Sequence, residues 1–286
     1  MKSVVITGAS SGIGLTTCSI FLEKGYHVFG SVRNKKDATR LKGVFTERFV
    51  PLLFDVNKKN EIEKSITVVK AHIGKNNLTA LVNNAGIAVI GPLEYLDIND
   101  FRYQLETNLI GTLNCIQSFL PLLKNEIDDT QPKGRIVNIS SALGGKVGYP
   151  FYGAYCSSKH ALEGLSETLR RELTIHGVKV SIVAPGAIQT PIWDKAENVA
   201  IEEKYDNTCY SEAFQKMIAD MKKLGQNGLK PETVSKKILK AVQDKKPKIR
   251  YTFISELTLN IMYLAPRRLM DKLVTRYLGL ESTARK

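Results

Sequence analysis

Short apolar runs alternate with amphipathic patterns over the first 190 residues of this chain. Between the apolar runs, apolar residues recur every three or four positions, which is the period of a helix buried on one face. Strands that alternate with helices predict an α/β fold with a doubly wound parallel sheet of the Rossmann type. The predicted strands cover residues 3–7, 26–32, 49–54, 78–82, 135–140 and 178–184, and the clearest helices cover 61–73, 101–123 and 155 to about 176.

The pattern changes after residue 190, although no internal repeat or second domain boundary interrupts the chain. Residues 192–224 are rich in apolar and aromatic side chains between charges, which predicts a helical lid over a lipophilic ligand; ordinary packing explains them equally well. A helix over 234–242 and an edge strand over 248–254 follow. We therefore predict a single domain over 1–286, divided into a core (1–190), a lid with the last strand (191–254) and a C-terminal extension (255–286).

A glycine-rich turn separates the first strand from the first helix. Its sequence is Thr7-Gly8-Ala9-Ser10-Ser11-Gly12-Ile13-Gly14. Glycines allow a tight turn and a close approach of the backbone to a pyrophosphate, and the free N–H groups of the helix N-terminus bind phosphates. Because the turn opens a β-α-β unit, we predict a dinucleotide site that includes Gly8, Ser10, Ser11, Gly12, Ile13 and Gly14.

The residues after the second strand bear on which dinucleotide binds. Arg33 stands nineteen residues after Gly14, where an NAD site usually has an acidic residue for the ribose 2′-hydroxyl. A cation there suits the 2′-phosphate of NADP, so NADP(H) is preferred. Asp37 keeps NAD(H) as an alternative, and Arg33 would then be an ordinary solvated charge.

Further candidates stand where later strands end, because ligands collect at the carboxyl ends of parallel strands. Asp55 is placed to meet an adenine ring, and asparagines at a strand end can hold a neighbouring loop. These candidate cofactor-binding residues are Asp55, Val56, Asn83, Ala85, Gly86, Pro185 and Gly186.

Tyr155 and Lys159 are one helical turn apart, so their side chains face the same volume. An ammonium beside a phenol favours the phenolate and brings proton transfer nearer to neutral pH. The pair alone is also common on ordinary helices, where the tyrosine packs and the lysine is solvated.

Composition narrows the class of protein. The chain has 286 residues, 43% of them hydrophobic, and a net charge of +13, most of it in residues 221–286, which contain sixteen Lys and Arg against five Asp and Glu. Such a basic region is compatible with solubility alone, with an anionic membrane surface or with nucleic acid, but it offers no stacking platform for bases, so we expect no nucleic-acid partner.

Four widely spaced cysteines predict reduced thiols in the cytoplasm without a disulfide or metal site, and the N-terminus has no signal-peptide pattern.

Together these motifs resemble the short-chain dehydrogenase/reductase family over about residues 1–190. The matching positions are Thr7-Gly8-x-x-x-Gly12-x-Gly14, Asp55, Asn83-Asn84-Ala85-Gly86, Asn108, Ser141, Tyr155-x-x-x-Lys159, Pro185-Gly186 and Thr190. One departure is that Ser141 lies fourteen residues before the tyrosine, where thirteen is usual in the family. Position 142 is alanine, so we predict a loop longer by one residue, with Ser140 as the weaker candidate.

The resemblance implies a set of catalytic roles. Tyr155 is the acid in reduction and the base in oxidation, Ser141 holds the substrate oxygen, and Lys159 binds the nicotinamide ribose and lowers the tyrosine pKa. Asn108 positions a water that relays protons to Lys159. By the same analogy Ile188 and Thr190 meet the nicotinamide carboxamide.

The resemblance also predicts a function, namely NADP(H)-dependent interconversion of a carbonyl and an alcohol on a steroid-, retinoid- or lipid-like substrate. The alternatives are a reductase of small or polar carbonyls and a non-catalytic dinucleotide sensor or scaffold. The family implies a homodimer or homotetramer. The extension resembles that of hydroxysteroid and retinol dehydrogenases; it predicts a cover over the substrate cleft, a subunit contact or peripheral membrane contact.

Overall fold

The computed structural model describes residues 1–45, 47–124, 133–142, 147–190, 204–253 and 265–281. Within these residues, seven strands form one parallel sheet in the order β3-β2-β1-β4-β5-β6-β7. The strands are β1 (Ser3–Ile6), β2 (His27–Val32), β3 (Phe49–Leu53), β4 (Ala80–Asn83), β5 (Arg135–Ile139), β6 (Lys179–Pro185) and β7 (Arg250–Phe253). The predicted doubly wound parallel sheet is confirmed, with the last strand at its edge.

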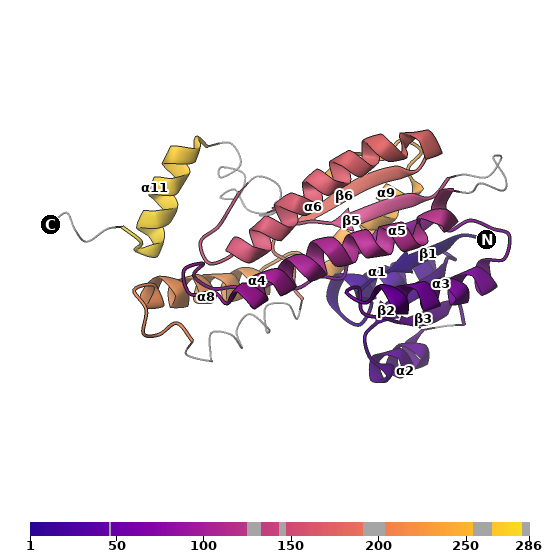
Figure 1. The fold of residues 1–286 in the computed structure, drawn as a ribbon, viewed down its shortest axis with the longest axis horizontal. Coiled ribbons are helices and arrows are strands. Elements are labelled where there is room, and N and C mark those ends of the chain that lie inside the picture. Colours follow the sequence, from indigo (N-terminus) through magenta and orange to yellow (C-terminus); the bar gives the residue numbers. More distant parts are fainter. Residues whose placement is uncertain (46, 125–132, 143–146, 191–203, 254–264, 282–286) are drawn as a thin grey trace.

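Helices cover both faces of the sheet because successive strand residues point to opposite sides. In β1, Val4 and Ile6 pack into one apolar cluster and Val5 into the other. The strands therefore read as continuous apolar runs rather than as alternating ones. One layer contains α1 (Gly12–Glu23), α2 (Lys35–Val44) and α9 (Pro231–Gln243), and the other contains α3 (Lys59–Ile73), α5 (Gly111–Lys124) and α6 (Gly153–Glu172) (Figure 1).

The order of the strands reverses between β1 and β4. From β1 the chain winds outward to β2 and β3, and it then returns to β4 on the other side of β1. The loops that leave these two strands separate at this switch point, which is where doubly wound sheets bind ligands. The residues that follow β1 and β4 therefore face a common crevice.

A third apolar cluster lies beyond the sheet and contains Phe151, Phe214, Met217 and Leu278. It joins the start of α6 to α8 (Ser211–Gln226) and α11 (Arg267–Leu278). Figure 1 shows α8 and α11 at the end of the molecule opposite the N-terminus. The predicted lid is thus helical from Ser211, whereas residues 191–203 and 254–264 of the predicted lid and extension lie outside the described residues.

Two predicted elements differ from the structure. The helix predicted over 101–123 is divided into α4 (Ile98–Leu105), a π-helical turn η1 (Glu106–Ile110) and α5, and the helix predicted to end near 176 is α6 followed by a 3₁₀ turn η3 (Leu173–His176). Helix α2 was not predicted, because Leu41 is its only buried residue and leaves no apolar period in the sequence. Its start is fixed instead by Asn34, whose side chain accepts a hydrogen bond from the Asp37 N–H.

Candidate active site

The glycine-rich turn forms a cradle that has no room for side chains. A Cβ on Gly14 would lie 2.1 Å from the Gly8 carbonyl oxygen, and a Cβ on Gly8, which has a φ of +69°, would lie 2.9 Å from the Cα of Ala85. Asn84 closes the cradle from the β4 side, since its Nδ2 donates to the carbonyls of Thr7 and Gly8 at 2.9 and 3.2 Å. This close backbone packing at a helix N-terminus fits the pyrophosphate of a dinucleotide.

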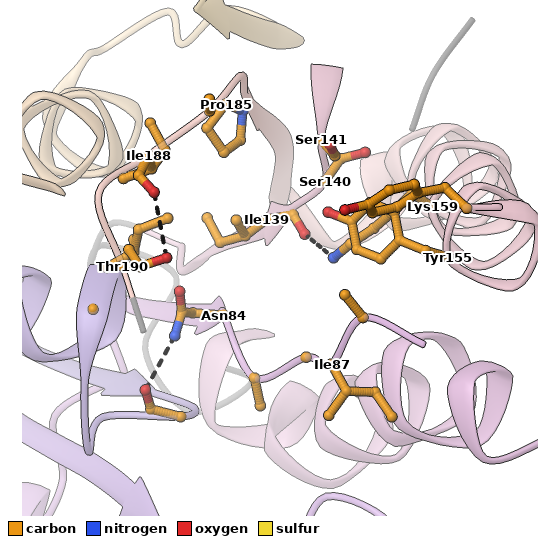
Figure 2. Close-up of a pocket in the computed structure, with 18 of the residues that line it drawn as sticks. Asn84, Ile87, Ile139, Ser140, Ser141, Tyr155, Lys159, Pro185, Ile188 and Thr190 are labelled. Carbon is orange, nitrogen blue, oxygen red and sulfur yellow. Dashed lines mark hydrogen bonds between the residues drawn. The ribbon is translucent and has the colours of Figure 1, made fainter. Parts of the chain in front are cut away.

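A cavity of about 840 Å³ runs from this cradle across the carboxyl ends of the strands. Of the predicted site residues, those that line it are Gly8, Ser10, Ser11, Gly12, Ile13, Arg33, Asp55, Val56, Ala85, Gly86, Ser141, Tyr155, Lys159, Pro185, Gly186, Ile188 and Thr190. Figure 2 shows the catalytic end, where Tyr155 and Lys159 on α6 stand opposite the loop from Pro185 to Thr190.

Three predicted residues do not line this cavity. Gly14 packs against the backbone of the turn, where a Cβ would meet the Gly8 carbonyl oxygen. Asn83 is buried, and its Nδ2 donates to Asn138 Oδ1 at 2.8 Å; its contact with the cofactor stays a prediction. Its neighbour Asn84 lines the cavity instead, because adjacent strand-end residues point to opposite sides. The third is Asn108.

Asn108 lies in η1, and its side chain is 1% exposed. Its Oδ1 accepts from the Ile87 N–H at 2.9 Å, and its Nδ2 donates to the Ile87 carbonyl at 3.0 Å and to Ser158 Oγ at 3.1 Å. Both ends of the amide are thus used to hold the loop after β4. The structure gives this side chain a structural role beside Gly86, and the predicted water relay to Lys159 stays a prediction.

Gln104 lies one helical turn before Asn108 and holds the same loop. This role of Gln104 was not predicted from the sequence. Its Oε1 accepts from the Val89 N–H at 2.6 Å, and its Nε2 donates to the Ile87 carbonyl at 3.0 Å. Gln104 is fully buried. The only sequence signal was a glutamine four residues before Asn108, which places the two amides on one helical face.

The catalytic side chains meet at the N-terminal part of α6. Ser141 and Tyr155 both line the cavity, and the Ser141 hydroxyl acts to lower the pKa of the Tyr155 phenol. Lys159 Nζ lies 5.8 Å from the centroid of the Tyr155 ring and donates to the Ile139 carbonyl at 2.8 Å (Figure 2). Ser140 also lines the cavity, but its buried hydroxyl has no hydrogen-bond partner among the described residues. The choice of Ser141 as the catalytic serine, with Ser140 as the weaker candidate, stays a prediction.

Burial dominates the proton affinities of the two titratable groups. Desolvation raises the pKa of Tyr155 to about 12, against the smaller opposing effect of the Ser141 hydrogen bond. Desolvation likewise lowers the pKa of Lys159 to about 8, against the field of Glu163. Lys159 Nζ is directed to the Ile139 carbonyl, and burial is the dominant effect on the pKa of Tyr155; the lowering of that pKa by Lys159 stays a prediction.

The far end of the cavity is apolar and aromatic, and most of it was not predicted from sequence. Tyr149 and Tyr152 line it six and three residues before Tyr155, just ahead of α6, and ring contacts connect the three residues. A run of tyrosines spaced by three was the available signal. Helices α8 and α11 complete the wall with Met221, Leu224, Met270, Leu273, Val274 and Tyr277.

Polar contacts attach α11 to α8 over this end of the cavity. The Tyr277 hydroxyl donates to Asp220 Oδ2 at 2.7 Å, and the ammonium of Lys216 lies 4.1 Å from the centroid of the Tyr277 ring. The extension therefore covers the cleft, one of its three predicted roles.

Comparison with known proteins identifies the family to which the chain belongs. A family model described as short chain dehydrogenase matches residues 2–200, which is more than half of the chain. The chain belongs to the short-chain dehydrogenase family. It is therefore an oxidoreductase that acts on CH–OH groups, as predicted.

Two relatives and one solved structure are similar to this short-chain dehydrogenase over most of its length. An NADPH-dependent 3-dehydrocapnine reductase from Ornithobacterium rhinotracheale is 38% identical over 96% of each chain. Retinol dehydrogenase 16 from Mus musculus is 37% identical over 68% of this chain and 59% of the relative. The structure described as ElxO with NADP bound is 27% identical, has a TM-score of 0.69, and aligns over 88% of this chain and 96% of the other.

Proposed function

We propose that this short-chain dehydrogenase reduces a ketone on a lipophilic, lipid-like molecule. The observation that carries the proposal is a single cavity with two ends: Ser141 and Tyr155 line it together with the phosphate cradle and with the apolar wall from α8 and α11. The cofactor is NADP(H). Arg33 at the adenosine end agrees with the NADPH-dependent relative and with the NADP-bound structure.

In this reaction NADPH supplies the hydride when it is bound. The groups of the protein handle the charge and the proton. As negative charge develops on the carbonyl oxygen, the Tyr155 hydroxyl donates its proton to that oxygen and Ser141 donates a hydrogen bond to it. A phenol whose pKa is raised to about 12 stays protonated at neutral pH, which suits the acid role in reduction. Lys159, with Nζ near the phenol ring, is the group that we assign to the nicotinamide ribose.

The chemistry of the far wall favours a lipophilic substrate over a small polar carbonyl. The cavity of about 840 Å³ contains the cofactor region as well as this wall, and the wall is its apolar end. Its far wall contains Met, Leu and Val side chains together with three tyrosines. The relative aligned over nearly the whole chain carries 3-dehydrocapnine in its name, and we take that ketone as the first substrate to test.

A panel of carbonyls tests this proposal. It contains 3-dehydrocapnine, a 3-ketosteroid, retinal and a small polar ketone, each assayed with NADPH and with NADH. We expect the highest kcat/KM for a long-chain ketone with NADPH. Preference for the small polar ketone would favour the alternative reductase, and binding of NADPH without turnover of any member would favour the non-catalytic sensor.

We expect the enzyme to be a homodimer or homotetramer, and light scattering tests this.

Peripheral membrane contact is a second proposal about partners. Its support is α11, which exposes Leu269 and Leu273 beside Arg267, Arg268 and Lys272. No described helix could cross a bilayer. Flotation with anionic and neutral liposomes, with and without residues 256–286, tests the contact, and equal flotation of the two forms would reject it.

A further inference from the structure

An acidic residue stands in the part of the cavity that we assign to the adenosine ribose. Asp37 lines the cavity together with Arg33 and Asn34. A free carboxylate there would accept hydrogen bonds from the ribose hydroxyls of NADH and would repel the 2′-phosphate of NADPH. Asp37 is therefore at odds with the NADP(H) preference unless something in the protein neutralises it.

The structure provides that group in Arg40, one turn along α2. Arg40 Nη2 lies 3.0 Å from Asp37 Oδ1. The other carboxylate oxygen, Oδ2, accepts from Asn34 Nδ2 at 2.9 Å. Both oxygens of Asp37 therefore have protein donors. These contacts, with Arg40 the largest contributor, lower the pKa of Asp37, so the carboxylate is ionised and paired at neutral pH.

Arg40 is also fixed to the phosphate cradle. Its Nη2 donates to the Ser10 carbonyl at 2.6 Å, and Ser10 itself lines the cavity. The guanidinium is thus held between the glycine-rich turn and Asp37, with a planar set of donors that suits this bridging position. An exposed ion pair of this kind contributes little to stability, so folding alone does not account for such a placement.

Arg33 differs from Arg40 in its surroundings. It is exposed, and no hydrogen bond or ion pair recorded for the described residues involves it. Its guanidinium is available to the 2′-phosphate. The two arginines are therefore suited to different tasks: Arg33 can contact the phosphate, and Arg40 occupies the carboxylate.

We propose that Arg40 is a positioning residue for cofactor choice, which keeps Asp37 paired with protein donors and so permits the 2′-phosphate of NADPH beside it. This inference rests on the NADP(H) assignment above. Without Arg40, Asp37 keeps only the Asn34 contact on Oδ2, its Oδ1 can accept from ribose hydroxyls, and selectivity shifts toward NADH.

Binding of the two cofactors to purified protein tests this without any substrate. The variants are Arg40→Gln, Asp37→Asn and the double variant, with Lys42→Gln as a control that removes an exposed charge from the same helix. Dissociation constants come from the fluorescence of NADPH and NADH. We expect Arg40→Gln to weaken NADPH binding by about tenfold or more and NADH binding much less, because a carboxylate without its partner cation then faces the phosphate. Lys42→Gln should leave the ratio unchanged.

The double variant separates a positioning role from direct contact. If Arg40 acts by pairing with Asp37, removing the carboxylate as well restores NADPH binding to near the level of Asp37→Asn. A double variant that binds NADPH as weakly as Arg40→Gln would overturn the proposal, because Arg40 would then bind the phosphate itself. An unchanged NADPH to NADH ratio in Arg40→Gln would also overturn it. A wild-type protein that prefers NADH would instead reject the NADP(H) assignment.

Discussion

Ser141 and Tyr155 line the same cavity although they come from different elements, and the Ser141 hydroxyl acts to lower the pKa of the Tyr155 phenol. Ser141 follows β5, and Tyr155 lies in the first turn of α6. The cavity thus presents two hydroxyl donors to one volume, which is the arrangement that proton delivery to a developing alkoxide needs.

Replacing Ser141 by alanine should therefore slow reduction with little effect on cofactor binding. Loss of one donor to a developing oxyanion typically lowers kcat by about 10²–10³-fold. Steady-state kinetics and NADPH fluorescence titration measure the two effects. Ser140→Ala is the matched control, since Ser140 does not bond to Tyr155, and an equal loss of kcat in that variant would contradict the assignment.

The pH dependence of reduction should reflect Lys159. Burial lowers the pKa of Lys159 to about 8, so its charge is present below that pH and is lost above it. We expect kcat/KM for reduction to be level between about pH 6 and 7.5 and to fall as the pH rises through about 8. In Lys159→Arg, whose guanidinium stays charged, the residual activity should show no fall there. A fall at the same pH in both proteins would assign it to another group.

The wall formed by α11 should affect substrate binding selectively. Leu273 and Leu269 are 50% and 48% exposed, but only Leu273 lines the cavity. Leu273→Ser should raise KM for a long-chain ketone by about tenfold through lost apolar contact, and Leu269→Ser should not. Kinetics with a long-chain ketone and with a small ketone test this. Equal effects of the two variants would show that α11 acts only through stability.

Gln104 should matter for stability because its amide satisfies buried backbone groups. Gln104→Leu leaves the Val89 N–H without its acceptor, which should lower the free energy of unfolding by about 1–3 kcal/mol. Arg102→Leu, an exposed change on the same helix, should alter it by less than about 0.5 kcal/mol. Urea unfolding of both variants measures the difference, and similar stabilities would contradict the role of Gln104.

The sequence was sufficient for those features that depend on local patterns. The positions of the strands along the chain, the glycine cradle and the shared helical face of Tyr155 and Lys159 follow from apolar periodicity, the glycine motif and helical spacing. The family to which the chain belongs was also recognised from its motifs.

The remaining features depend on tertiary contacts that sequence spacing does not encode. Asp37 could be an acceptor for NAD or the partner of an arginine, and only the folded position of Arg40 distinguishes these. The pKa of Tyr155 is set by how deeply the phenol is buried rather than by its neighbour in the helix. Asn83 and Asn84 are adjacent in sequence, yet only the second lines the cavity.

The central claim is that the Tyr155 hydroxyl delivers the proton that accompanies hydride transfer. Tyr155→Phe removes that hydroxyl and keeps the ring, so the most direct measurement is kcat for ketone reduction by this variant beside its dissociation constant for NADPH. The account predicts a kcat lowered by about 10²–10⁴-fold and an NADPH affinity close to that of the wild type. Turnover near the wild-type rate, with NADPH still bound, would contradict it.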